Sequence, residues 1–264
     1  MKLATTALAC LMMAAPLAGQ APSGKKWSFG LYGDAPGLGM YLRQLEDNSQ
    51  TKFDAKKDLG LKSDKLGLGA RIDYLGPRGG FQLDIGFHDF AGHRRMTEPT
   101  DVGGQTFEEG TDVTSSLKNT TVDITGTIKI LRFEHFWLGV DLGLQAWWMQ
   151  VRAEAKNTSA AHREDDDGPV SYSLPLPIPQ LGLSCGAKAF GDALEFRGRV
   201  HFLAYSGATY TLFAADARYY FLPWLGARAF VENQRFDVPF GSIQEDMEAR
   251  IDNNRFGVGV ALRW

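Results

Sequence analysis

The last ten residues of the chain, Arg255–Trp264, alternate strictly between two kinds of side chain. Every second residue is large and apolar, and the residues between them are small or cationic. Because successive side chains of a β-strand point to opposite faces, this alternation predicts a strand with one apolar and one polar face. The sheet that contains this strand must therefore meet an apolar environment on one side and a polar one on the other.

Nine earlier segments show the same alternation, so we expect an all-β fold. Between them lie polar connections, Gly-rich turns and no obvious internal repeat or domain boundary. The ten predicted strands centre on residues 27–33, 66–74, 81–87, 122–130, 136–148, 174–189, 194–202, 213–221, 225–232 and 255–264.

The connections between these segments are sorted by length. Tight turns follow the second, fourth, sixth and eighth strands, whereas long polar segments follow the first, third, fifth and ninth (residues 34–65, 92–112, 152–168 and 237–253). Only Ser206-Gly207, after the seventh strand, is short where a long connection is expected. Alternating short and long connections with an even strand number are typical of a single antiparallel transmembrane β-barrel. We expect about ten strands, with eight and twelve as alternatives.

The sixth strand is irregular. Leu174, Leu176 and Ile178 alternate with prolines, and the apolar phase then moves to Leu181 and the residues after it. Since a change of phase requires one extra residue and proline cannot donate to a ladder, we expect a β-bulge near Pro179-Gln180.

Composition limits the classes of function. The formal net charge is −3, which gives no basic field for nucleic acid, so no nucleic-acid partner is expected. No segment after the N-terminal region carries the roughly 20 apolar residues of a membrane helix. A barrel wall tolerates this polarity because every second residue points away from lipid.

The N-terminal residues 1–20 are predicted to be a secretory signal peptide, with Lys2 followed by an apolar run and small residues. The cleavage site is not fixed by the sequence. The remaining residues, 21–264, are predicted to form one barrel domain. If Cys10 leaves with the signal, Cys185 is the only cysteine and no intramolecular disulfide can form.

The chain as a whole resembles the small outer-membrane β-barrel proteins of Gram-negative bacteria. The resemblance rests on the amphipathic last strand with its terminal aromatic, the exported N-terminus, the alternation over ten segments, and the Asp58-Leu59-Gly60-Leu61 stretch before a Gly-Pro-Arg-Gly turn. It implies localisation in the cell outer membrane, long extracellular loops, short periplasmic turns and a favoured monomeric state. It also implies two partners, the outer-membrane lipids including lipopolysaccharide and the outer-membrane assembly machinery. The residues implied as the assembly signal are Phe256, Val258, Val260, Leu262 and Trp264.

The phase of the alternation directs a nearly balanced set of charges toward the interior. Because a charge in a narrow low-dielectric tube is costly unless it is paired, we expect interlocking salt bridges that close most of the lumen. The alternative is a polar conduit for small charged solutes. The predicted lumen charge network consists of Arg71, Asp73, Asp84, His88, Asp123, Lys129, Asp141, Glu195, Arg197, Arg199, His201, Asp216, Arg218, Arg228, Glu232, Arg255 and Arg263.

The sequence favours a non-enzymatic structural or narrow-pore protein of unknown substrate. The alternatives are a lipid-modifying enzyme and a surface adhesion or interaction barrel that acts through its long loops. No catalytic residue is assigned, because the histidines at 88 and 201 are phased into the lumen, away from any lipid substrate. No metal site and no cofactor are expected, since no zinc-ligand spacing and no phosphate-binding loop is present.

Overall fold

The structure is a computed structural model of the chain, and it describes residues 27–46, 49–62, 65–102, 105–155, 170–239 and 247–264. The predicted signal peptide lies outside the described residues and stays a prediction. No helix among the described residues has the length and apolarity to cross a membrane. The strands are β1 (Trp27–Glu46), β2 (Ser49–Asp54), β3 (Gly67–Leu75), β4 (Gly79–Arg95), β5 (Thr100–Val102), β6 (Gln105–Phe107), β7 (Asp112–Arg132), β8 (Phe136–Ala155), β9 (Val170–Ala189), β10 (Leu194–Tyr205), β11 (Ala208–Tyr220), β12 (Leu225–Val238) and β13 (Met247–Arg263).

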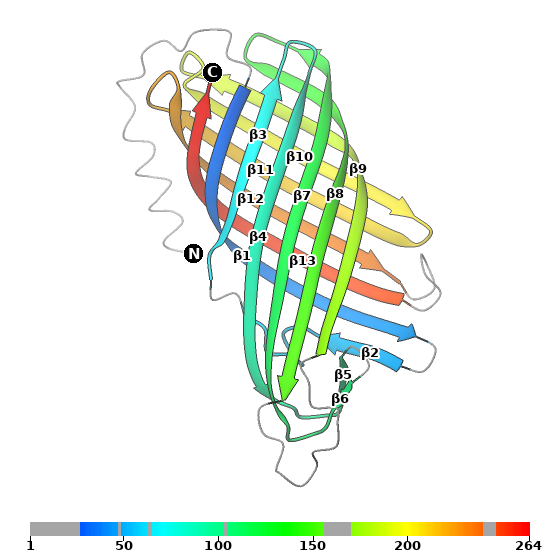
Figure 1. The fold of residues 1–264 in the computed structure, drawn as a ribbon. Helices are drawn as coiled ribbons and strands as arrows, with labels where there is room; N and C mark the ends of the chain where they lie inside the picture. Colours follow the sequence, from blue (N-terminus) through cyan, green and yellow to red (C-terminus); the bar gives the residue numbers. More distant parts are fainter. Residues whose placement is uncertain (1–26, 47–48, 63–64, 103–104, 156–169, 240–246) are drawn as a thin grey trace.

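Ten of these strands form one closed antiparallel barrel (Figure 1). The order around the barrel is β1, β3, β4, β7, β8, β9, β10, β11, β12 and β13, and β13 pairs back onto β1. That closing ladder runs from the pair Ser28–Arg263 to the pair Gln44–Met247. The predicted barrel of ten strands is confirmed.

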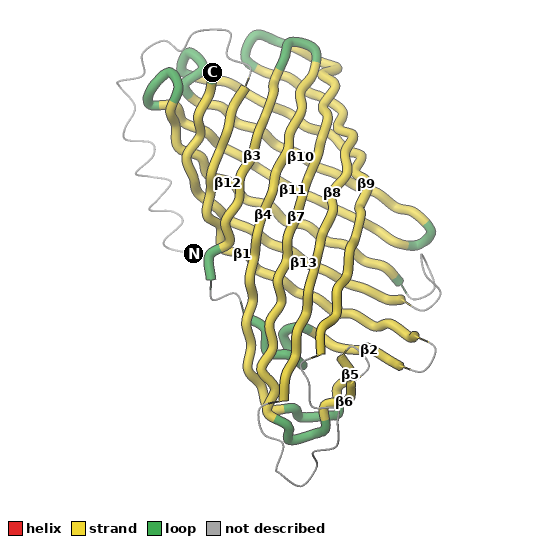
Figure 2. Tube along the Cα trace, viewed as in Figure 1, coloured by secondary structure: helices red, strands yellow, loops and turns green. Residues whose placement is uncertain are grey.

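The two ends of the barrel differ, as Figure 2 shows. The tight turns β3–β4, β7–β8, β9–β10 and β11–β12 lie at the end that carries the C-terminus, which we call the turn end. The opposite loop end carries the short strands β2, β5 and β6, which add to the wall through β1. The connection β10–β11 is also tight, and both its residues, Ser206 and Gly207, have positive φ, as a two-residue hairpin turn requires.

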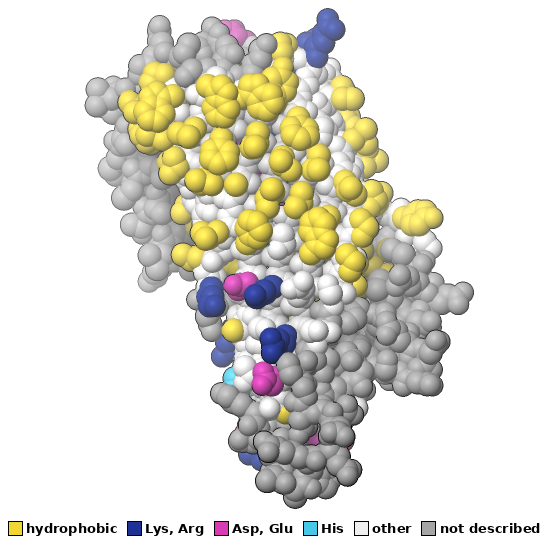
Figure 3. Space-filling view, in the orientation of Figure 1, with side chains coloured by type: hydrophobic (Ala, Val, Ile, Leu, Met, Phe, Trp, Pro, Cys, Tyr) yellow, Lys and Arg dark blue, Asp and Glu magenta, His cyan; other side chains and the backbone are white. Residues whose placement is uncertain are grey.

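An apolar belt covers the outside of the barrel nearest the turn end (Figure 3). Exposed Phe, Trp, Leu, Ile and Val side chains from the ten barrel strands form it, and aromatic residues such as Trp27, Trp224 and Trp264 rim its turn-end border. Aromatic rings at that position suit the headgroup level of a bilayer. Toward the loop end the outward residues become polar, as at Asp89, which follows Phe87 on the outer face of β4. The barrel wall therefore continues beyond the belt.

This projecting part explains why the predicted strands were too short. β1 continues past Gly33 to Glu46, and β13 starts at Met247 rather than Arg255. Pro36, inside the segment predicted as a loop, lies just beyond the last β1–β3 pair and opposite Arg255 of β13, where one neighbouring strand remains among the described residues. Part of each predicted polar loop is thus barrel wall whose outer face meets water.

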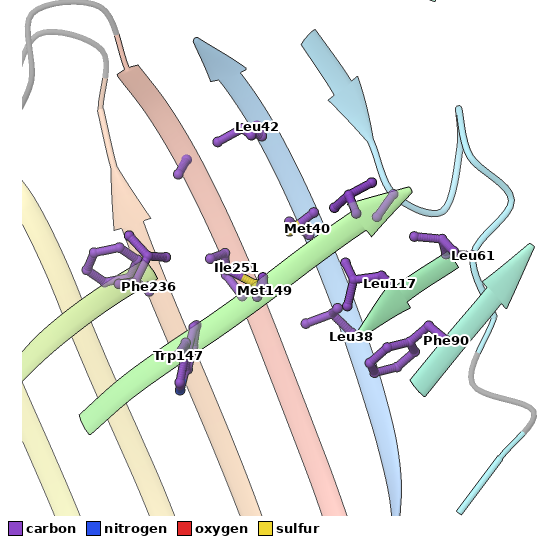
Figure 4. Close-up of a cluster of buried hydrophobic side chains, with 14 of the residues drawn as sticks. Leu38, Met40, Leu42, Leu61, Phe90, Leu117, Trp147, Met149, Phe236 and Ile251 are labelled. Atoms are coloured by element: carbon purple, nitrogen blue, oxygen red, sulfur yellow. The ribbon is translucent and has the colours of Figure 1, made fainter. Parts of the chain in front are cut away.

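Inside the projecting part a large cluster of apolar side chains is buried (Figure 4), together with a few polar ones such as Ser115 and Asn119. On β8 the buried residues Trp147, Met149 and Val151 alternate with the exposed Gln150 and Arg152. This projecting core contains Leu38, Met40, Leu42, Ala55, Leu59, Leu61, Phe90, Met96, Phe107, Val113, Leu117, Trp147, Met149, Val151, Ala153, Leu176, Ile178, Ala208, Tyr210, Leu212, Phe236, Val238, Ala249 and Ile251.

The predicted bulge near Pro179-Gln180 is wrong. The β8–β9 register is continuous from Phe136–Ala187 to Ala153–Val170. Leu176 and Ile178 simply face the projecting core, so the change of phase reflects a change of environment and not an extra residue. The prolines lie in the part of β9 before Gly182, which has no β10 partner, so the ladder to β8 survives without their N–H groups. The irregularity that does occur is in β7, between Lys129 and Leu131.

The position of the belt can be tested with one buried charge. Val260 is the middle outward residue of the belt on β13 and is 51% exposed. Val260→Arg should lower the free energy of unfolding in bilayers by about 2–4 kcal/mol, because the guanidinium would enter hydrocarbon. The control is Thr209→Arg, exposed on β11 beyond the belt, for which about 1 kcal/mol or less is expected. Denaturant titration in lipid vesicles measures both, and equal effects would contradict the assigned belt.

Candidate functional site: the charged interior

A carboxylate at the centre of the belt-level interior binds three arginines. Asp216 on β11 accepts hydrogen bonds from Arg218 Nε at 2.7 Å, from Arg71 Nη1 at 3.4 Å and from Arg228 Nε. Strands β3 and β12 supply Arg71 and Arg228, so this one residue joins strands from different sides of the lumen. The side chains of all four are at most 8% exposed.

The network extends from Asp216 in two directions. Arg71 Nε donates to Asp84 Oδ2 at 2.5 Å, and Asp84 also accepts from the Tyr32 hydroxyl at 2.6 Å. On the other side Arg218 Nη2 lies 2.8 Å from Asp73 Oδ2. Asp73 in turn accepts from Arg197 Nη1 of β10 at 2.7 Å. Alternating carboxylates and guanidiniums thus span the lumen from β4 to β10.

A second group of ion pairs lies closer to the loop end. Glu232 accepts from Arg255, and its other oxygen lies 3.5 Å from Arg199 Nη2. Arg199 also reaches Asp123 at 3.5 Å, and Arg255 lies 3.8 Å from Asp34. The five charged side chains of this group are each at most 7% exposed.

The two interior histidines each contact one aspartate. His88 Nε2 lies 3.1 Å from Asp34, and His201 Nε2 lies 3.0 Å from Asp141. Asp141 also accepts the hydroxyl of Ser184 at 2.6 Å. These are the residue types of a hydrolase triad, but the carboxylate lies between the hydroxyl and the imidazole. A base that activates a nucleophile must itself contact that hydroxyl, so this arrangement is not catalytic in form.

A layer of uncharged polar groups ends the network on its loop side. Tyr210 donates to Gln145 Oε1 at 2.9 Å, and Gln180 Nε2 donates to the Tyr210 hydroxyl at 3.1 Å. Beyond this layer begins the projecting core, into which Leu59 and Leu61 fold from the segment between β2 and β3. The Ser115 hydroxyl holds that segment by donating to the Leu59 carbonyl at 2.5 Å.

The turn end is more open than the rest of the interior. Arg263 Nη1 lies 3.3 Å from Glu195, and its guanidinium stacks 3.8 Å from the ring centre of Tyr220. A cavity of about 40 Å³ opens here, with Asp73 and Arg218 among its lining residues. Deeper in the network a space of about 10 Å³ lies between Arg71, Arg199, Asp216 and Glu232, about the smallest volume that holds one water.

The structure places the predicted lumen residues inside the barrel, and all of them except Lys129 take part in these ion pairs or histidine–aspartate contacts. Lys129, Glu195 and Arg197 are part-exposed near the turn end, and the other fourteen are buried. Sequence reasoning missed Asp34, Tyr32, Ser28 and Asp192. Asp34 was missed because the first strand was ended at Gly33, although it continues the inward phase of Ser28 and Tyr32, which lie inside that strand but carry no charge.

Among the residues that the structure describes, no group of three or more His, Cys, Asp or Glu side chains could hold a metal ion. Cys185 is a free thiol. The ionised side chains of the network form ion pairs with one another. Such pairing offsets the free-energy cost of burying charges at low dielectric.

Comparisons with known proteins agree with this geometry. No protein-family model and no curated protein sequence matches the chain. Among solved structures, the outer membrane protease OmpT from Escherichia coli has a TM-score of 0.60 at 11% identity, covering 95% of this chain and 99% of that one. The translocator domain of the autotransporter NalP from Neisseria meningitidis has a TM-score of 0.40 at 14% identity, covering 98% of each chain.

The likeness to OmpT shows the fold. The closed sheet and the apolar belt are those of an integral transmembrane β-barrel, the architecture that the chain shares with this outer-membrane protein.

The contribution of Asp216 to the free energy of unfolding can be measured. Asp216→Asn removes the charge that compensates three buried arginines, so we expect the free energy of unfolding to fall by about 3–5 kcal/mol. The matched control is Asp237→Asn, whose pairs with Arg235 and Arg250 are 3.6 and 4.0 Å long and exposed, and about 1 kcal/mol or less is expected. Denaturant titration in the same vesicles compares them. Similar losses would show that the network contributes no more than a surface ion pair.

Proposed function

We propose that the protein is a closed, non-conducting outer-membrane barrel with a structural role. The observation that carries this proposal is that two different fillings occlude the lumen in series. The ion-pair network centred on Asp216 fills the belt level, and the projecting core fills the wall beyond it. An ion that crossed would have to displace paired guanidiniums and then enter an apolar interior, and both steps are costly.

A narrow pore is the alternative that this filling opposes. Conduction needs a continuous polar path, whereas the interior beyond Gln145 and Tyr210 is lined by residues such as Trp147, Leu212 and Ile251, which are at most 1% exposed. Permeation would then require rearrangement of the projecting core.

We also propose that the protein has no enzymatic activity. The support is the burial of its interior histidines, since His88 and His201 are 2% and 0% exposed and each faces an aspartate. A lipid-modifying enzyme needs its base and nucleophile where an outer-leaflet lipid can enter. The decisive assay is mass spectrometry of lipid A and phospholipids from cells with and without the gene, for which we expect identical profiles.

A second candidate function is favoured by the projecting part. It carries the small sheet of β1, β2, β5 and β6, and its outer face bears exposed charges such as Lys118, Arg152 and Arg250. A rigid wall that stands clear of the belt can present these groups to a partner at the cell surface, as an adhesion or interaction barrel would. The lipid partners and the assembly role of the outward residues Phe256 to Trp264 belong to the same proposal of an outer-membrane barrel.

Planar-bilayer recording of the refolded protein tests the closed state. We expect no measurable current from the natural sequence. Because the two fillings act in series, neither Arg218→Ala nor Trp147→Ala alone should conduct, whereas the double variant should leak. The heat-dependent shift of folded barrels in gel electrophoresis controls for folding. Steady channel events from the natural sequence would contradict the proposal, and a leak from either single variant would contradict the arrangement in series.

A further inference from the structure

Two cations at the turn end have no carboxylate partner. Lys129 Nζ donates to the Gly76 carbonyl at 2.9 Å, and Arg132 Nη1 donates to the Pro77 carbonyl at 3.4 Å. Neither forms an ion pair with any residue that the structure describes, whereas the arginines of the network, such as Arg218 and Arg263, all do. Lys129 and Arg132 thus bring two positive charges without acidic partners to this rim.

These cations line a pocket of about 330 Å³ between three turns. The turn β3–β4 supplies Leu75, Gly76 and Pro77, the β7–β8 hairpin supplies residues 129 and 132–137, and the β9–β10 region supplies Lys188 and Asp192. Lys188 is already paired with Asp192 at 3.1 Å. The other acid of the lining, Glu134, lies 3.7 Å from His135 Nε2 at the exposed tip of the hairpin. Lys129 and Arg132 are thus the lining cations without an acidic partner among the described residues.

An aromatic ring in the pocket lining contacts Lys129. Trp137 is 8% exposed, and its ring lies 5.2 Å from Lys129 Nζ and 5.9 Å from the guanidinium carbon of Arg197. Cations over an aromatic face are held in place at little cost. Trp137 therefore holds Lys129 at the pocket, whereas Arg197 is already paired with Asp73.

The same hairpin places apolar side chains beside the cations. Leu131, Phe133 and Phe136 are 49%, 67% and 42% exposed. The rings of Phe133 and Phe136 stack with centroids 6.3 Å apart. The β-bulge between Lys129 and Leu131 makes this possible, because it turns both Ile130 and Leu131 outward while Lys129 stays at the pocket. Such a surface matches an anion that carries hydrocarbon chains.

We propose that this pocket binds the phosphate of an anionic phospholipid from the leaflet that meets the turn end. Lys129 and Arg132 contact the phosphate, and the acyl chains lie along Leu131, Phe133 and Phe136 on the belt. Charge-assisted hydrogen bonds to two cations give affinity, and the adjoining apolar surface distinguishes a lipid from free phosphate. This site is independent of whether the lumen conducts.

Native mass spectrometry of the full-length folded protein in a non-ionic detergent tests the proposal, with equimolar phosphatidylglycerol and phosphatidylcholine as probes. The protein should retain phosphatidylglycerol preferentially. The double variant Lys129→Gln, Arg132→Gln should weaken that retention about a hundredfold, since each of the two lost charge-assisted contacts is worth about a factor of ten. The matched control is Lys118→Gln, Arg152→Gln, which removes one lysine and one arginine from the loop end of the same hairpin and should change nothing.

Two further measurements keep the test decisive. Brominated phosphatidylglycerol should quench the emission of the natural sequence more than that of Trp137→Phe, which reports occupancy without altering a cation. Inorganic phosphate should displace the lipid poorly. Equal retention of both lipids, equal losses in the two double variants, or full displacement by inorganic phosphate would each overturn the assignment to a phospholipid.

Discussion

Backbone N–H and C=O groups at membrane depth have no water to bind, so each must find its partner within the sheet. The ladder between β1 and β13 meets this requirement, because it removes the two edges that a ten-stranded sheet would otherwise expose to lipid. Closure also creates an interior that the chain must fill. A barrel of this size is only slightly wider than those that side chains fill completely, so the choice of filling determines what the molecule can do.

The chain fills this interior with charged side chains at one level and with apolar side chains at another. Both fillings come from the same alternation of side chains along the strands. At belt level the large apolar residues face lipid, which leaves the inward positions to charged groups that pair around Asp216, Asp73 and Glu232. Beyond the belt the outer face meets water, and the same alternation then turns its apolar residues inward. Gln145, Gln180 and Tyr210 form the polar layer between the two fillings. The interior is therefore occluded by electrostatic pairing at one level and by apolar packing at the next.

Much of this could be predicted from the sequence. The alternation in segments such as Arg255–Trp264 fixes which residues face lipid, and the Gly- and Pro-rich turns fix which strands are neighbours. The sequence could not show that the alternation continues with inverted polarity, so Leu176 and Ile178 suggested a bulge and Asp34 was placed in a loop. It also could not show that Arg71 and Arg228 share Asp216. The position of each residue along the barrel axis depends on the stagger between strands that lie far apart in the chain.

The wall beyond the belt encloses a sealed apolar core, and the closed state of the lumen depends on it. Cysteine accessibility tests this directly, in a chain whose Cys10 and Cys185 are replaced by Ala. Arg250 and Ile251 are consecutive on β13, exposed and buried respectively. A water-soluble maleimide should label Arg250→Cys rapidly in the folded protein and Ile251→Cys only after unfolding. Equal labelling of both positions in the folded protein would show that water fills the lumen there and would contradict the account.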